Sequence, residues 1–284
     1  MQKKKLNAAS VLGRGILYII LLLLTAVTLF PIIYSVFGSF KETQELMVST
    51  SLLPKKFTLD NYIYAWKNVN FALYAMNSLI VAVAVVILGV LNTTMTAYVL
   101  SRRKFRGKKV INGLYMASMF IATGPATIYP MYNILVNTGL NNSLLGLILL
   151  SAGASAANIF LTVGYLEGIS RDFDDAARID GCSFFRIYIQ IILPLMLPII
   201  TVIALLTFRG SWNNYLMPMI VTSGKPNLMT LPVAVVSLKS SGGMATMWSV
   251  ILAAANISLI PIIIVYIICN KQFINGLTAG GIKG

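Results

Sequence analysis

Residues 170–194 read Ser-Arg-Asp-Phe-Asp-Asp-Ala-Ala-Arg-Ile-Asp-Gly-Cys-Ser-Phe-Phe-Arg-Ile-Tyr-Ile-Gln-Ile-Ile-Leu-Pro and form a polar island in an otherwise apolar chain. The island holds four of the chain's eight acidic residues, Asp172, Asp174, Asp175 and Asp180. Asp172 can cap a short helix, and Asp174 and Asp175 then lie in the positive first turn of that helix. The pattern therefore predicts a short helix between two apolar segments.

The rest of the island indicates how this helix ends and what it can contact. Asp174 and Arg178 are four residues apart, so they can pair on one face. Gly181 follows the helical pattern, as a glycine after a helix usually does. The small side chains of Ala176 and Ala177 allow the surface of another protein to approach closely. The alternative is an ordinary solvated loop between two membrane spans.

The composition is that of a membrane protein. Of the 284 residues, 57% are apolar and only 11% are charged, and the mean hydropathy is +0.82. The net charge of +14 could suggest nucleic-acid binding, but the basic residues cluster between apolar runs, as membrane topology requires. There is no histidine, and the two cysteines offer neither a disulfide framework nor zinc-ligand spacing. We expect no catalytic residue, no metal site and no nucleic-acid partner.

Six apolar runs are each long enough, at roughly 20 residues, to cross a bilayer as a helix. They cover residues 16–37, 77–100, 110–136, 144–166, 191–212 and 248–268. The first run could instead be a cleaved signal peptide, but it exceeds the roughly 7–15 residues of a signal-peptide core, so an uncleaved span is favoured. The expected organisation is a short segment at 1–15, a transmembrane domain at 16–270 and a tail at 271–284. Residues 217–247 are expected to form a longer loop.

The distribution of basic residues predicts the orientation of the chain. Of the 22 lysines and arginines, 15 lie in segments on one side of the predicted spans and six on the other, with Arg209 inside the fifth span. Because basic residues are enriched on the cytoplasmic side, both termini and the polar island are expected to be cytoplasmic. The protein is thus expected to be a multi-pass membrane protein in contact with lipid.

The spans also indicate what the protein lacks. All eight acidic residues lie between the predicted spans, whereas an ion-coupled secondary transporter usually keeps an ionisable residue at membrane depth. An intramembrane enzyme is disfavoured for the same reason. No phosphate-binding loop of the G-x-x-x-x-G-K-[ST] type occurs in the chain. If ATP drives this protein, another chain must hydrolyse it.

The amino-acid sequence of the polar island resembles the EAA loop of the permeases of ABC importers. The similar residues are Asp175, Ala176, Ala177, Arg178, Asp180 and Gly181, followed by Leu193 and Pro194. The family pattern is Glu-Ala-Ala, two residues, Asp-Gly, and an apolar stretch ending in Leu-Pro. Asp175 stands where the family usually has glutamate. The resemblance implies that residues 167–190, with Asp174 included, form a coupling loop that binds an ATPase subunit.

Two further stretches are similar to carbohydrate permeases like the smaller permease subunit of the maltose importer. The tail Gly276–Gly284 resembles their Gly-Leu-x-Ala-Gly-Ala-x-Lys-Gly ending, and Trp212-Asn213 resembles their Trp-Asn motif. Ala97 and Tyr98, with the arginines that follow, match the end of their second span. The likeness extends from about residue 52 to the end. It favours a sugar over the alternative solutes, which are amino acids, phosphate and polyamines.

The resemblance implies an all-α, type I ABC importer permease fold and a set of partners. A second homologous permease, two ATPase subunits that hold ATP and magnesium, and an external substrate-binding protein would complete the importer. This chain itself would bind no cofactor.

Two groups of residues are candidates for other roles in such an importer. In the loop at 217–247, Ser240, Ser241, Gly242 and Gly243 are expected to contact the binding protein. Polar residues within or beside the spans could line the substrate pathway or form helix–helix hydrogen bonds, and the latter role is favoured. They are Tyr129, Asn158, Asn213, Asn214 and Asn256.

Overall fold

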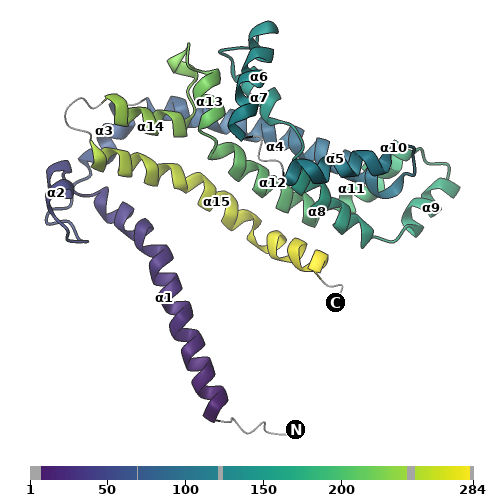
Figure 1. The fold of residues 1–284 in the computed structure, drawn as a ribbon, viewed down its shortest axis with the longest axis horizontal. Helices are drawn as coiled ribbons and strands as arrows, with labels where there is room; N and C mark the ends of the chain where they lie inside the picture. Colours follow the sequence, from purple (N-terminus) through teal and green to yellow (C-terminus); the bar gives the residue numbers. More distant parts are fainter. Residues whose placement is uncertain (1–7, 69, 121–123, 242–246, 282–284) are drawn as a thin grey trace. The chain divides into compact units, whose positions relative to one another are not determined.

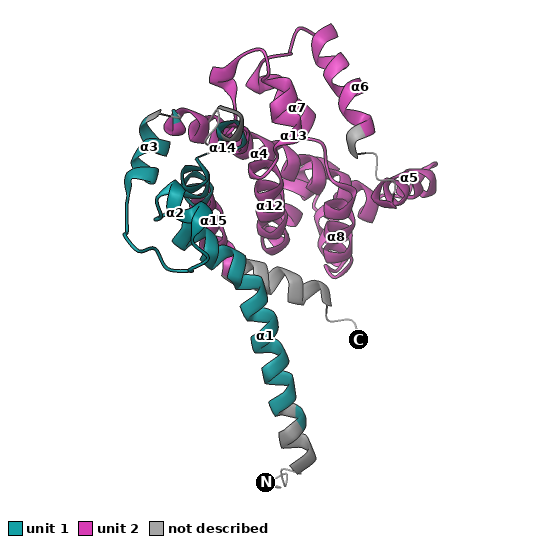
Figure 2. Ribbon diagram, turned by 60° about the vertical axis from the view of Figure 1, so that its left-hand side comes forward, with its two compact units in different colours: residues 1–70, 235–257 teal, residues 71–234, 258–284 magenta. Residues whose placement is uncertain are grey.

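The computed structural model describes residues 8–68, 70–120, 124–241 and 247–281, and all elements in these ranges are helical (Figure 1). The all-α prediction is therefore confirmed. The chain forms two compact units, Met1–Asn70 with Val235–Ile257, and Phe71–Ala234 with Ser258–Gly284 (Figure 2). The long C-terminal helix α15 (Trp248–Gly281) contributes residues to both units.

The first unit contains α1 (Ala8–Gly38), α2 (Thr43–Val48) and α3 (Asp60–Asn68). Hydrogen bonds fix the turn after α1, because buried Asn61 donates to the backbone oxygens of Ser39 and Lys41, each at 2.8 Å. The apolar window of α1, within Gly15–Gly38, has no buried residue, so the helix exposes its apolar side chains over this window. Such a helix needs lipid or a partner protein to cover it.

The second unit is organised around α4 (Phe71–Arg102). This helix packs against α7 (Leu144–Ser151), α8 (Ala156–Glu167) and α12 (Leu197–Trp212) (Figure 1). Gly89 allows the close approach of α4 and α12, because a Cβ atom there would lie 3.3 Å from Cγ2 of Thr207. A third of the apolar window of α4 is buried, which makes α4 the central helix of the unit.

The remaining elements of this unit are shorter. They are α5 (Lys108–Phe120), α6 (Gly124–Asn137), α9 (Asp172–Ile179), α10 (Phe184–Ile187), a π-helical segment (Tyr188–Ile192), α11 (Leu193–Leu195), α13 (Leu216–Val221), a 3₁₀ turn (Pro226–Leu228) and α14 (Leu231–Ser241), whose last turns belong to the first unit. Residues 217–247 were predicted to be a loop, and this was wrong. Much of that segment is helical, because apolar side chains such as those of Leu231 and Val233 are buried.

Three of the described helices are long and apolar enough to cross a membrane, namely Gly15–Gly38, Phe71–Arg102 and Trp248–Asn270. Two bent pairs raise the number to five if each pair is one span: α7 with α8, bent by 50°, and Phe184–Leu195 with α12, bent by 81°. The second bend follows Pro194 and precedes Pro198, whose missing N–H groups and fixed φ favour a break. The third predicted span, 110–136, corresponds to α5 and α6, which are separated by residues outside the described part. The number of six spans stays a prediction.

Candidate functional site

The predicted short helix of the polar island is α9, and its ends are well defined. Ser170 precedes the helix and its Oγ accepts a hydrogen bond from the backbone N of Asp172 at 3.2 Å. Asp172 is the first helical residue rather than the cap. At the other end Gly181 has a φ of +79°, and its N–H donates to the Arg178 carbonyl at 3.0 Å. The predicted glycine termination is confirmed, because this left-handed conformation strains any other residue.

The two adjacent aspartates of α9 point in different directions. The side chain of Asp174 is 2% exposed, whereas that of Asp175 is 63% exposed. The predicted pair of Asp174 with Arg178 is wrong. Arg178 instead pairs with Asp175, with Nη1 3.1 Å from Oδ1, because Asp174 faces the interior. Adjacent helical residues are about 100° apart, so one carboxylate can face the interior while the next one faces outward.

Asp174 is held by two residues of the last turns of α4. Tyr98 Oη donates to Asp174 Oδ1 at 2.9 Å, and Arg102 Nε lies 3.1 Å from Oδ2 as an ion pair, without hydrogen-bond alignment. Arg102 Nη2 also donates to the backbone oxygen of Ile169 at 2.8 Å. We call Tyr98, Arg102, Ile169 and Asp174 the Asp174 cluster. A buried carboxylate is stable only with such partners, because removing it from water costs several kcal/mol.

Aromatic rings cover the Asp174 cluster and connect α4 to the segment after Gly181. Phe184 stacks on Tyr98 with ring centroids 4.6 Å apart, and the guanidinium carbon of Arg103 lies 4.1 Å from the Phe184 centroid. The hydroxyl oxygens of Tyr188 and Thr94 are 2.8 Å apart. The carbonyl of Ile169 before α9 accepts from Arg102, and the ring of Phe184 after α9 stacks on Tyr98, so the segments on both sides of α9 contact the end of α4.

The outer face of α9 is open. Ser170, Asp172, Phe173, Ala176, Asp180 and Ile191 line a groove along it. Phe173 is 49% exposed and Ile179 is 88% exposed, although both are large and apolar. Exposed apolar side chains beside small ones and a rim of carboxylates are typical of a protein–protein contact surface. The small side chain of Ala176, like Asp175, is exposed on α9, whereas Ala177 is buried in the core.

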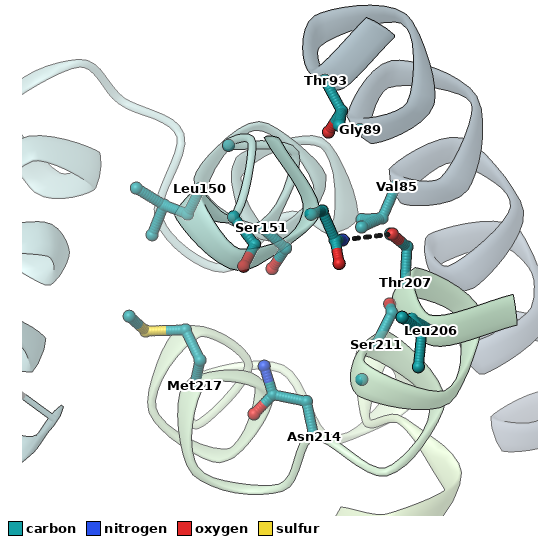
Figure 3. A pocket seen from close by; sticks show the side chains of 14 residues that line it. Val85, Gly89, Thr93, Leu150, Ser151, Leu206, Thr207, Ser211, Asn214 and Met217 are labelled. Atoms are coloured by element: carbon teal, nitrogen blue, oxygen red, sulfur yellow. Dashed lines mark hydrogen bonds between the residues drawn. The ribbon is translucent and has the colours of Figure 1, made fainter. Parts of the chain in front are cut away.

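A second site is a cavity of about 420 Å³ between α4, α7, α8, α12 and the start of α13 (Figure 3). Asn158 and Asn214, which the sequence proposed for a substrate pathway, both line it. Asn158 Nδ2 donates to Thr207 Oγ1 at 3.4 Å. Sequence reasoning missed the hydroxyl groups of this cavity, which come from Thr93, Ser151, Ser155, Thr207 and Ser211. Their signal was weak, because serine and threonine are common in helices of any kind.

The other proposed pathway residues lie elsewhere. Tyr129, on α6, is 76% exposed, and Asn213 is an exposed residue at the C-terminus of α12. In the first unit, Asn256 Oδ1 accepts from Ser35 Oγ and its Nδ2 donates to the Ser35 backbone oxygen, both at 3.1 Å. Asn256 thus forms the helix–helix hydrogen bonds that the sequence analysis favoured for these polar residues.

The proposed binding-protein contacts lie near the limit of the described residues. Ser240 and Ser241 end α14, and Gly242 and Gly243 lie outside the described residues. Within the part of the chain that the structure describes, no three acidic or cysteine side chains are grouped so that they could hold a metal ion.

The sequence of the whole chain can be compared with the sequences of known proteins. The family described as binding-protein-dependent transport system inner membrane component matches residues 14–273. The probable ABC transporter permease protein YurM of Bacillus subtilis is 30% identical, over 96% of this chain and 90% of YurM. The arabinooligosaccharides transport system permease protein AraQ of Halalkalibacterium halodurans is 31% identical, over 91% of this chain and 92% of AraQ. The probable starch degradation products transport system permease protein AmyC of Thermoanaerobacterium thermosulfurigenes is 33% identical, over 87% of this chain and 88% of AmyC.

A solved structure has the same fold. One chain of the crystal structure of a bacterial ABC transporter involved in the import of the acidic polysaccharide alginate matches with a TM-score of 0.83 and 24% identity. The match covers 95% of this chain and 100% of that chain. The family match over residues 14–273 includes α9 and the residues that line the cavity. This chain belongs to the family of binding-protein-dependent transport system inner membrane components.

Proposed function

We propose that this chain is a permease subunit of an ABC importer for oligosaccharides and forms half of its translocation pore. The open face of α9, with exposed Phe173 and Ile179 beside Ala176, carries the proposal, because it offers an apolar contact surface on a helix fixed to the membrane domain. An ATPase subunit would bind this face. ATP and magnesium would bind only to that partner.

The oligosaccharide substrate is inferred from relatives and from the cavity. AraQ and AmyC are named for arabinooligosaccharides and for starch degradation products. The cavity offers hydroxyl and amide groups, among them Ser151, Asn158 and Asn214, and has no charged lining residue. Neutral donors and acceptors are suited to the hydroxyl groups of a sugar, which also need hydrogen-bond partners when they leave water.

The remaining partners follow from the exposed surfaces and the expected topology. The apolar surface of α1 would lie in lipid or against a second, homologous permease. The termini and α9 would be cytoplasmic, in the plasma (inner) membrane of a bacterium. A substrate-loaded binding protein would bind on the other side, near Ser240–Gly243, and release its sugar when the ATPase subunits close.

Transport by purified components tests this function. The chain would be reconstituted in proteoliposomes with its partner permease, its ATPase and its binding protein, and given radiolabelled arabinooligosaccharides, maltooligosaccharides, an amino acid, phosphate or spermidine. We expect uptake of an oligosaccharide that requires both ATP and the binding protein. Uptake of only a non-sugar solute would contradict the proposed substrate, and uptake driven by an ion gradient without ATP would contradict the importer class.

A further inference from the structure

We propose that Tyr98 and Arg102 are positioning residues for energy coupling, which attach α9 to α4 through Asp174 so that movement of α9 is transmitted along α4 to the cavity. This inference rests on the proposed function and assigns a role to a buried polar cluster. According to this inference, the adjacent residues Asp174 and Asp175 have separate roles. Asp175 is exposed to a partner, and Asp174 fixes the helix.

The first step is the attachment of α9. Asp174 uses both carboxylate oxygens, one toward Tyr98 at 2.9 Å and one toward Arg102 at 3.1 Å. Arg102 also binds the Ile169 carbonyl, which lies before α9 in the chain. The same guanidinium therefore holds α9 and the segment that leads into it. Rotation of α9 away from α4 would leave a carboxylate and a guanidinium buried without partners, which is strongly unfavourable.

The second step is transmission along α4. This helix runs without interruption from Phe71 to Arg102 and contains no proline. Val85, Gly89 and Thr93 of α4 line the cavity, and Thr93 is nine residues from Arg102. At 1.5 Å per residue, that separation is about 14 Å of continuous helix. A helix of this length without a kink moves as a rigid element, so a displacement at the Asp174 cluster also displaces the cavity wall.

The third step is the contact of α4 with the opposite wall. α12 packs on α4 and contributes Thr207 and Ser211 to the cavity. At Gly89 the two helices are so close that a Cβ atom would be 3.3 Å from the Thr207 methyl group. Close packing leaves no slack to absorb a shift of α4, because packed interfaces switch between discrete arrangements.

The test measures saccharide imported per ATP hydrolysed, in the same proteoliposomes. This ratio does not depend on the fraction of active complexes, so a variant that only folds poorly leaves it unchanged. We expect Asp174→Asn to lower the ratio about tenfold, and Tyr98→Phe to lower it about threefold, because the first removes a charge from the pair and the second removes one hydrogen bond. Hydrolysis itself should remain within about twofold of wild type, because the outer face of α9 is intact.

Tyr188→Phe is the matched control. Tyr188 is buried like Tyr98, at 4% and 1% exposure, but its hydroxyl binds Thr94 and not Asp174. The control should keep the wild-type ratio. If the complex with Asp174→Asn does not assemble, the ratio of saccharide to ATP measured for Tyr98→Phe and for Tyr188→Phe tests the inference.

An unchanged ratio in Tyr98→Phe, or an equal loss in Tyr188→Phe, would overturn the inference. These outcomes are separate from a failure of the proposed function. If the wild-type importer accepts another solute, the proposed substrate is wrong, and the ratio can still be measured with that solute.

Discussion

The two ends of the path along α4 differ in how their polar groups are satisfied. At the Asp174 cluster, a carboxylate that is 2% exposed has a partner at each oxygen, at 2.9 and 3.1 Å. In the cavity, the hydrogen bond that Figure 3 marks, from Asn158 to Thr207, is long at 3.4 Å. The Tyr98 hydrogen bond and the ion pair with Arg102 restrain Asp174 more than one long hydrogen bond restrains Asn158, although Arg102 Nε and Asp174 Oδ2 are not aligned for a hydrogen bond. On the proposed function, the coupling end is therefore the more rigid one and the substrate end is the one more open to a ligand.

The largest effect is expected at the coupling end, from Gly181→Val. A Cβ atom added at Gly181 would meet no atom within 4 Å, so this position is not crowded. The difficulty is the φ of +79°, because a β-branched residue is a marked outlier in that conformation. We expect the bend after α9 to be lost and ATP-driven transport to fall more than about tenfold, with membrane insertion retained.

The matched control for that variant is Gly164→Val. Gly164 also has nothing within 4 Å of an added Cβ, but it lies inside α8 and has no positive φ. Transport measured in membrane vesicles should stay near wild type in the control. Normal transport by Gly181→Val would remove the conformational argument for the end of α9.

A smaller effect is expected where α4 packs on α12 at the cavity, from Gly89→Leu. This change puts a large side chain where a Cβ atom alone is already tight against Thr207, and such overpacking costs about 1–3 kcal/mol. We expect lower thermal stability of the purified complex and a transport rate reduced about fivefold, with Gly164→Leu close to wild type. Equal melting temperatures for the two variants would contradict the close α4–α12 packing.

The smallest effect is expected at the substrate end, from Asn158→Ala. Because its hydrogen bond to Thr207 is long, its loss should cost little stability. The affinity of the open cavity for sugar should fall, and we expect a transport rate lowered about threefold with an unchanged ratio of sugar to ATP. A changed ratio of sugar to ATP with an unchanged transport rate would mean that Asn158 takes part in coupling. That result would contradict the proposed difference between the Asp174 cluster and the cavity.

The sequence predicted the features that depend on neighbouring residues. The helix at α9 and its end at Gly181 were found because helix termination is a local signal. The partner of Asp174 was not found, because Tyr98 lies 76 residues away and only packing brings the two together. The spacing of the two aspartates allowed them to point about 100° apart, but it did not indicate which of them is buried.

The bends and the helices after α12 show a second limit of sequence reasoning. Pro194 and Pro198 lie on either side of the bend in the predicted fifth span, but their positions do not determine an angle of 81°. Residues 217–247 were predicted to form a loop. The apolar run from Leu231 to Val236 was the missed signal for α14.

The most direct test of the central claim is whether α9 is the surface that the ATPase covers. Ile179 is 88% exposed on α9, so a cysteine there can report on contact. Cys182 and Cys269 would first be replaced by serine. Membranes containing Ile179→Cys would then be treated with an impermeant maleimide, with and without the ATPase subunits bound. We predict rapid labelling from the cytoplasmic side that the ATPase strongly reduces. Labelling that is the same with and without the ATPase, or that occurs from outside intact cells, would contradict the account.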